Sequence, residues 1–138
     1  MNLTEELKEL TKNLTVLYVE DEDNTRMQVS QILELFFKNV LVGENGEEAL
    51  KIYKQNDVDL IMTDLTMPKL NGYQMIKEIK KLDSLQHIIV LTAHNSSENL
   101  MQTIDLQLDG FLLKPLKMDK LLELLYKVTN VIQLEKNK

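Results

Sequence analysis

Five short apolar runs divide the chain, and each ends in polar or turn-forming residues. They predict strands over residues 15–20, 40–42, 58–63, 88–92 and 110–113. Short apolar runs separated by amphipathic segments are typical of buried parallel strands. The segments between them repeat apolar residues every three or four positions, which predicts helices. These helices are expected over 24–38, from Asn45, after Gly72, from Asn95 and over 118–133.

Strands that alternate with helices predict an α/β fold with a doubly wound, five-stranded parallel sheet. Right-handed crossovers with one reversal of winding favour the strand order 2-1-3-4-5, which is the flavodoxin-like arrangement. We therefore expect one domain over residues 15–133, followed by a polar tail over 134–138.

Residues 1–14 stand apart from this alternation. Leucines recur there about one helical turn apart, at Leu3, Leu7, Leu10 and Leu14. This spacing predicts an extra short N-terminal helix. Three interpretations remain open for it: a cap on the domain, half of a dimer seam, or a frayed chain end.

The composition of the chain excludes several classes of function. Acidic residues outnumber basic ones by 22 to 16, so the net charge of −6 lacks the basic footprint of a nucleic-acid-binding protein. The chain has no cysteine, which excludes thiolate metal sites and thiol catalysis. No glycine-rich phosphate loop is present. No apolar run approaches the roughly 18 residues of a membrane span, so we expect a cytoplasmic protein with no membrane insertion.

Polar side chains follow four of the five predicted strands at their carboxyl ends. They are Glu20 and Asp21, Asp64, Thr92, and Lys114. Ligands of an open parallel sheet bind outside the carboxyl ends of its strands. Three carboxylates, one hydroxyl and one ammonium group are therefore expected to meet at one edge of the sheet.

This set of groups suits phosphoryl transfer to an aspartate. Carboxylates held close together disfavour joint ionisation, and a divalent cation resolves that conflict. Oxygen ligands suit Mg²⁺, with Mn²⁺ as a substitute. An aspartate can attack phosphorus and form an aspartyl phosphate, while Lys114 and Thr92 can stabilise the oxygens of the transferred group. Each residue alone has an ordinary explanation as a turn, cap or surface residue; the combination predicts the chemistry.

From about Thr15 to Ile132 the chain resembles the receiver domain of two-component response regulators, and in particular the single-domain chemotaxis-type regulators. The segments that carry the resemblance are 17–22, 45–50, 63–68 with Gly72, 91–93 and 109–115. The resemblance implies that Asp64 is the phosphoacceptor. It places Glu20 and Asp21 in a Mg²⁺ site that also takes the backbone carbonyl of Thr66.

The resemblance also assigns the switch residues. It implies that Thr92 is the switch hydroxyl, that Lys114 binds the phosphate, and that the bond before Pro115 is cis. Phosphorylation would draw Thr92 inward, and Phe111 would rotate into the vacated space. Gln107 occupies a position where a helix-ending glycine is common. A residue other than glycine pays for the left-handed conformation, so the helix before it is expected to end differently.

The implied function is signal transduction. A histidine kinase or phosphotransfer protein would phosphorylate the domain, which is a phosphoacceptor rather than an enzyme, with only its own phosphorylation and slow dephosphorylation to catalyse. The face built from the helix after Asn95, strand 110–113 and helix 118–133 would then bind a downstream protein or a second copy. His94 is a weaker candidate for tuning phosphate lifetime, and no role is expected for His87.

Three alternatives compete with this prediction. A phosphohydrolase of the haloacid dehalogenase type would need a second acid two residues after Asp64, where Thr66 stands. A flavin-binding flavodoxin-like protein would need a phosphate loop in place of residues 20–23. A degenerate receiver would bind partners without phosphorylation. No second domain follows residue 133, which fits a stand-alone receiver or one cut from a longer protein.

Overall fold

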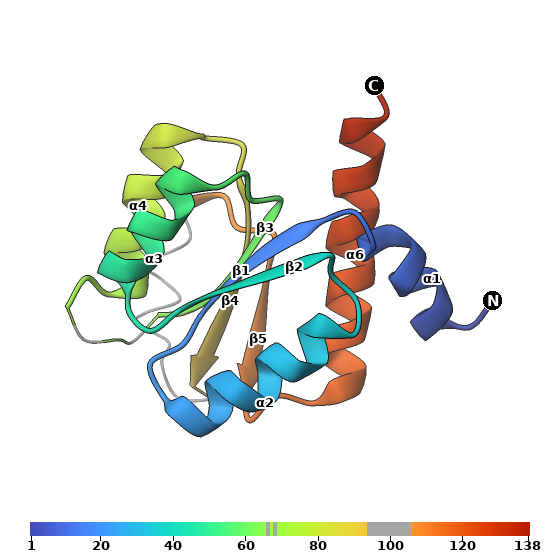
Figure 1. The fold of residues 1–138 in the computed structure, drawn as a ribbon, viewed down its shortest axis with the longest axis horizontal. Helices are drawn as coiled ribbons and strands as arrows, with labels where there is room; N and C mark the ends of the chain where they lie inside the picture. Colours follow the sequence, from blue (N-terminus) through green and yellow to red (C-terminus); the bar gives the residue numbers. More distant parts are fainter. Residues whose placement is uncertain (66, 68, 94–105) are drawn as a thin grey trace.

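The computed structural model describes residues 1–65, 67, 69–93 and 106–138. Thr66, His94 and the helix expected from Asn95 lie outside the described residues. One parallel sheet forms the centre, with strand order β2-β1-β3-β4-β5 (Figure 1). Its strands are β1 (Thr15–Val19), β2 (Asn39–Gly43), β3 (Leu60–Asp64), β4 (His87–Ala93) and β5 (Gly110–Lys114). The predicted fold class and strand order are confirmed.

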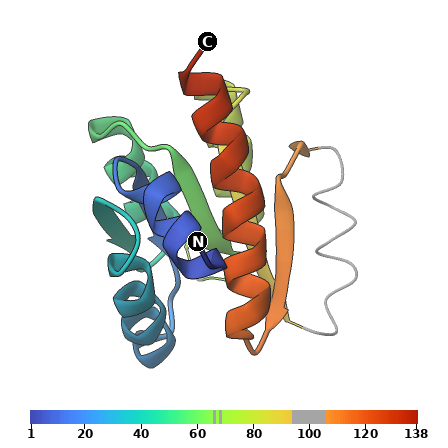
Figure 2. The same cartoon turned by 90° about the vertical axis from the view of Figure 1, so that its right-hand side faces the viewer.

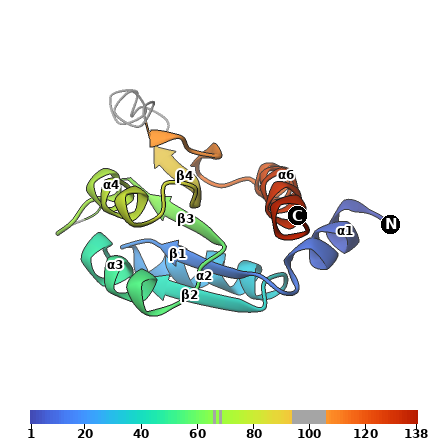
Figure 3. The same cartoon turned by 90° about the horizontal axis from the view of Figure 1, so that it is seen from above.

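Helices cover both faces of this sheet. Their bounds are α1 (Leu3–Thr11), α2 (Asp23–Glu34), α3 (Gly46–Gln55), α4 (Gly72–Leu82) and α6 (Met118–Lys136). α3 and α4 pack on one face, whereas α2 and α6 pack on the other (Figure 3). Among the described helices, none has the length and apolar character needed to cross a membrane.

The alternation of side chains along β1 shows why both faces are covered. Val16 and Tyr18 point into the core shared with α2 and α6, while Leu17 and Val19 point into the core shared with α3 and α4. All four are fully buried. A central parallel strand therefore reads as a continuous apolar run, because neither of its faces meets water.

The structure corrects several details of the predicted helices. The helix expected over 24–38 ends at Glu34, and the next turn places Phe36 and Phe37 in the core. The last helix runs to Lys136, three residues beyond the predicted end. Leu82, the final residue of α4, is 57% exposed although it continues the apolar period of that helix.

The N-terminal helix α1 lies beside α6 (Figure 2). Leu7 of α1 and Leu14, which precedes β1, are fully buried in the same core as α2 and α6. The Thr11 hydroxyl donates to the Phe36 carbonyl at 2.9 Å, and Gln133 of α6 donates its side-chain amide to the Leu10 carbonyl at 2.7 Å. These contacts join α1 to the end of α2 and to α6.

Candidate functional site

The predicted acidic residues meet at the carboxyl edge of the sheet. Glu20 and Asp21 follow β1, and Asp64 is the last residue of β3, the strand paired with β1. One carboxylate oxygen from each lies within 4.8 Å of the others. Glu20 is fully buried, Asp64 is 7% exposed, and Asp21 is open to solvent.

Lys114 enters the same cluster from the end of β5. Its ammonium group donates to a carboxylate oxygen of Glu20 at 2.8 Å and to one of Asp64 at 2.8 Å. Burial lowers the pKa of Lys114, but these two hydrogen bonds and the two carboxylate charges outweigh burial and hold the pKa above its ordinary value. Lys114 therefore stays cationic and offsets part of the negative charge of the cluster.

Glu20 is the most buried carboxylate of the cluster, and burial disfavours its charged form. Loss of water raises its pKa, and the charge of Asp64 raises it further, while the hydrogen bond from Lys114 acts in the opposite direction. A divalent cation would also favour the charged form. The donors are all oxygens and one of them is exposed, which fits a Mg²⁺ ion that keeps several of its waters.

Glu22 directly follows Asp21 in the chain, but its side chain caps α2. The Glu22 carboxylate caps α2 by accepting from the backbone N–H groups of Asn24 and Thr25. Those hydrogen bonds, led by the one with Thr25, lower the pKa of Glu22. Glu22 is thus committed to the start of the helix, and the carboxylates that could hold a metal ion are Glu20, Asp21 and Asp64.

Arg26 is a residue near the site that sequence reasoning missed. Its guanidinium donates to the backbone carbonyl of Glu20 at 3.0 Å and pairs with Asp23 at 2.6 Å and Glu44 at 3.3 Å. Arg26 therefore ties the first turn of α2 to the end of β1 and to the loop after β2. The sequence signal that could have identified Arg26 is a basic residue six positions after Glu20.

The backbone around Asp64 is held closely. The Thr63 hydroxyl donates to the Asp64 carbonyl at 2.8 Å, and the Gly72 N–H donates to the Leu65 carbonyl at 3.0 Å. A Cβ atom on Gly72 would lie 2.2 Å from the Asp64 carbonyl oxygen, so only glycine fits this approach. The start of α4 thus fixes the turn that presents Asp64.

The remaining predicted residues lie on β4 and β5. Thr92 is 1% exposed and stands one residue beyond Leu91, the β4 partner of Asp64. Phe111 is 43% exposed and lines a groove of about 720 Å³ between β5 and α6. The peptide bond between Lys114 and Pro115 is cis. Gln107 has φ of 54°, so it adopts the left-handed conformation although it is not glycine.

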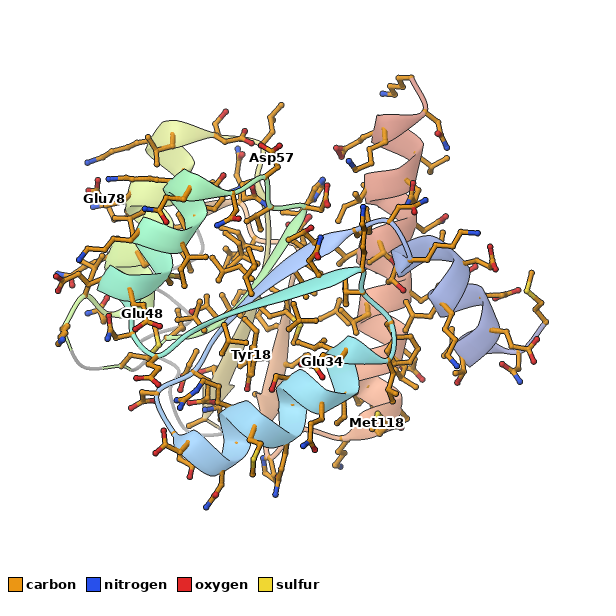
Figure 4. All side chains as sticks on the ribbon, viewed as in Figure 1. Tyr18, Glu34, Glu48, Asp57, Glu78 and Met118 are labelled. Atoms are coloured by element: carbon orange, nitrogen blue, oxygen red, sulfur yellow. The ribbon has the colours of Figure 1, made fainter. Side chains whose placement is uncertain are left out.

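Tyr18 lies beneath the acidic cluster and was also missed. It is fully buried, and among the described residues its hydroxyl has no hydrogen-bond partner. Burial raises the pKa of Tyr18, with the charges of Glu20 and Asp64 as further causes. Figure 4 shows the side chain between β1 and α2.

Comparison with known proteins agrees with this geometry. The response regulator receiver domain profile matches residues 16–126. A chemotaxis protein CheY from Bacillus subtilis is 34% identical over 116 residues, covering 83% of this chain and 97% of that protein. A chemotaxis protein CheY from Halobacterium salinarum is 37% identical over 100 residues, covering 72% and 83%. A receiver domain protein structure from Clostridium thermocellum has a TM-score of 0.80 at 28% identity, covering 88% of this chain and 98% of that one.

Proposed function

We propose, because this chain belongs to the response regulator receiver domain family, that it accepts a phosphoryl group on Asp64 in a two-component phosphorelay. The donor is a phosphohistidine of a histidine kinase or phosphotransfer protein. A carboxylate oxygen of Asp64 attacks phosphorus, the bond from phosphorus to the imidazole nitrogen breaks, and the imidazole leaves as a neutral base once protonated. The domain is a regulatory phosphoacceptor, and its catalysis is limited to its own phosphorylation and slow dephosphorylation.

The contact of Lys114 with both Asp64 and Glu20 carries this proposal. A mobile cation, already beside the nucleophile at 2.8 Å, can turn to an oxygen of the arriving phosphoryl group. Thr92, one row away on β4, supplies a hydroxyl for another oxygen. Glu20, Asp21 and Asp64 would hold Mg²⁺, which when bound neutralises charge on the phosphoryl oxygens.

Phe111 and Thr92 then form the switch. Thr92 moves toward the phosphoryl group, and the ring of Phe111 turns from the groove into the space beside β4. Phe111 is 43% exposed in this state, so turning inward would bury apolar surface of its ring. Coupling of this kind is typically worth about 1–3 kcal/mol.

The groove between β5 and α6 is the output surface of this switch. Apolar side chains of Phe111 and Leu113 line it, and exposed Lys117, Lys120 and Lys127 surround it with one acid, Glu123. This basic surface contrasts with the net charge of −6 of the whole chain. An acidic partner segment with apolar anchors fits it better than a second copy of this acidic chain does.

Phosphorylation by a small donor tests the proposal directly. The protein is incubated with acetyl phosphate and Mg²⁺, and its intact mass is measured beside Asp64→Asn. Asp57→Asn is the matched control, because Asp57 is exposed and lies at the other end of the sheet (Figure 4). We expect one phosphoryl group on the parent and on Asp57→Asn, none on Asp64→Asn, and loss of the reaction with chelator.

The contrary result has a definite meaning. If the parent gains no mass under conditions that phosphorylate another receiver, the phosphorelay role is wrong. The chain would then be a receiver fold that binds partners without phosphorylation.

A further inference from the structure

The buried hydroxyl of Tyr18 has no place in the mechanism above. Among the described residues, it is the one buried side-chain polar atom without a hydrogen-bond partner. Leaving such a group unpaired is unfavourable, typically by about 1–3 kcal/mol. Phenylalanine has nearly the same shape and would avoid this cost. A second state of the protein in which the hydroxyl is paired would explain why tyrosine stands at this position.

The sheet register indicates where that partner lies. Side chains alternate along a strand, so Tyr18 and Glu20 share one face of β1, and Met62 and Asp64 share one face of β3. Tyr18 is paired with Met62 in this register. The tyrosine therefore lies one row below the two buried carboxylates, on the face covered by α2 and α6.

Glu20 needs a new donor when the site changes state, a step that rests on the proposed function. Its carboxylate now accepts from Lys114 at 2.8 Å and from the backbone N–H of Glu22 at 3.3 Å. If Lys114 turns to a phosphoryl oxygen, fully buried Glu20 keeps only the longer of these bonds. A bound Mg²⁺ ion would take one oxygen from each carboxylate of the cluster, so the buried Glu20 oxygen that Lys114 leaves would still need a hydrogen-bond donor.

We propose that Tyr18 is a positioning residue that donates its hydroxyl to Glu20 when Lys114 leaves for the phosphoryl group. A tyrosine hydroxyl keeps its proton at neutral pH and is a good donor to a carboxylate. One movement then pairs two buried polar atoms, the Tyr18 hydroxyl and the Glu20 oxygen that Lys114 has left. Tyr18 disfavours the resting state and favours the loaded one.

Beryllofluoride, a phosphoryl mimic, tests this proposal with Tyr18→Phe. Tyr53→Phe is the matched control, since it removes a hydroxyl that donates to Gln86 at 2.8 Å, away from the site. Titration calorimetry with saturating Mg²⁺ gives the beryllofluoride Kd, and denaturant unfolding without beryllofluoride gives the resting stability. Calorimetric titration with Mg²⁺ in the absence of beryllofluoride gives the Mg²⁺ affinity.

We expect Tyr18→Phe to weaken beryllofluoride binding about tenfold. Its Mg²⁺ affinity and resting stability should match or exceed those of the parent, because Lys114 still holds Glu20 in that state. Tyr53→Phe should bind beryllofluoride like the parent. A role in packing alone would lower all three values for Tyr18→Phe together.

The outcomes separate the two proposals. Equal beryllofluoride affinity of Tyr18→Phe and parent overturns the role of Tyr18 and leaves the phosphorelay intact. Failure of the parent itself to bind beryllofluoride overturns both proposals.

Discussion

At the scale of single residues, Lys114 balances the charge of the site. It is the cation bonded to both buried carboxylates, and its side chain is 29% exposed. Replacing it with methionine would leave Glu20 buried beside Asp64 with no opposing charge. The pKa of Glu20 would then rise further, because burial and the charge of Asp64 already raise it.

We therefore expect Lys114→Met to slow phosphorylation by acetyl phosphate about 100-fold or more and to lower stability by about 1–3 kcal/mol. Time-resolved intact mass and urea unfolding measure the two effects. Lys117→Met is the control, since Lys117 lines the same groove but contacts neither carboxylate in the described contacts. Equal phosphorylation rates for both variants would contradict the role given to Lys114.

Gly72 gives a second prediction at this scale. A methyl group there would lie 2.2 Å from the Asp64 carbonyl oxygen, so the turn that presents Asp64 must shift. Gly72→Ala should lower stability by about 1–3 kcal/mol and slow phosphorylation. Gly110→Ala is a milder change, because its methyl group meets the mobile side-chain end of Leu124. Comparable loss of phosphorylation in both variants would refute the special role of Gly72.

At the residue scale, the sequence predicted the location of those side chains whose place is set by their position along a strand. Glu20, Asp64 and Lys114 end apolar runs, and the ends of parallel strands meet whatever the side-chain packing. Tyr18 and Arg26 could not be found in this way. Tyr18 reads as an ordinary core residue, and the contacts of Arg26 depend on how α2 packs across the end of β1.

At the scale of elements, a partly buried histidine joins β4 to the end of α6. His87 lies 2.8 Å from Asp109 through Nδ1 and 3.0 Å from Glu135 through Nε2. The hydrogen bond with Asp109 is the largest cause that raises the pKa of His87 to about 9, against the opposing effect of burial. Sequence reasoning gave His87 no role, because its partners are 22 and 48 residues away.

This contact should make stability depend on pH. Because the pKa is raised from 6.5 to about 9, the stabilisation is complete below pH 6.5 and is lost as pH rises through about 9. The loss should be on the order of 1–2 kcal/mol, since Glu135 is partly exposed and solvent screens it. Urea unfolding between pH 6 and 9.5 measures it, and His87→Gln should abolish most of this dependence. Burial lowers the pKa of Lys80, and the charge of Asp109 acts in the opposite direction.

The N-terminal helix gives the other element-scale prediction. The single hydroxyl proton of Thr11 is shared between two carbonyl oxygens, that of Leu7 at 2.8 Å and that of Phe36 at 2.9 Å. Thr11→Val keeps the shape and leaves the Phe36 carbonyl without this donor, so stability should fall by about 1–2 kcal/mol. Thr4→Val, at an exposed position of the same helix, should change it by less than about 0.5 kcal/mol. Equal effects would mean that α1 is not docked on the domain.

Element boundaries show where pattern reasoning is weakest. The apolar period continues through Phe36, so it predicted that α2 would extend to residue 38. The chain instead turns after Glu34, and the N–H of Lys38 bonds to the Leu14 carbonyl at 3.0 Å, which starts β2. Tertiary packing at the base of β1 sets this end, and no local signal encodes it.

At the scale of the whole molecule, charge is distributed unevenly. The carboxyl edge of the sheet gathers carboxylates, while the groove between β5 and α6 gathers lysines. Lys114 belongs to both, since it bonds the carboxylates and lines the groove. Under the proposed function, a change of charge at Asp64 would act on a residue that also lines the proposed output surface, which would give the switch a short physical route.

Binding of Mg²⁺ should stabilise the whole fold, because only the folded chain brings Glu20, Asp21 and Asp64 within reach of one ion. At a free Mg²⁺ concentration one hundred times Kd, the added stability is about 2.7 kcal/mol. Asp21→Asn should remove most of this gain and leave stability in chelator nearly unchanged, since Asp21 is exposed. Asp57→Asn should respond to Mg²⁺ like the parent. Urea unfolding with Mg²⁺ or with chelator measures these differences, and a parent midpoint that is the same in both would show that the carboxylates hold no ion.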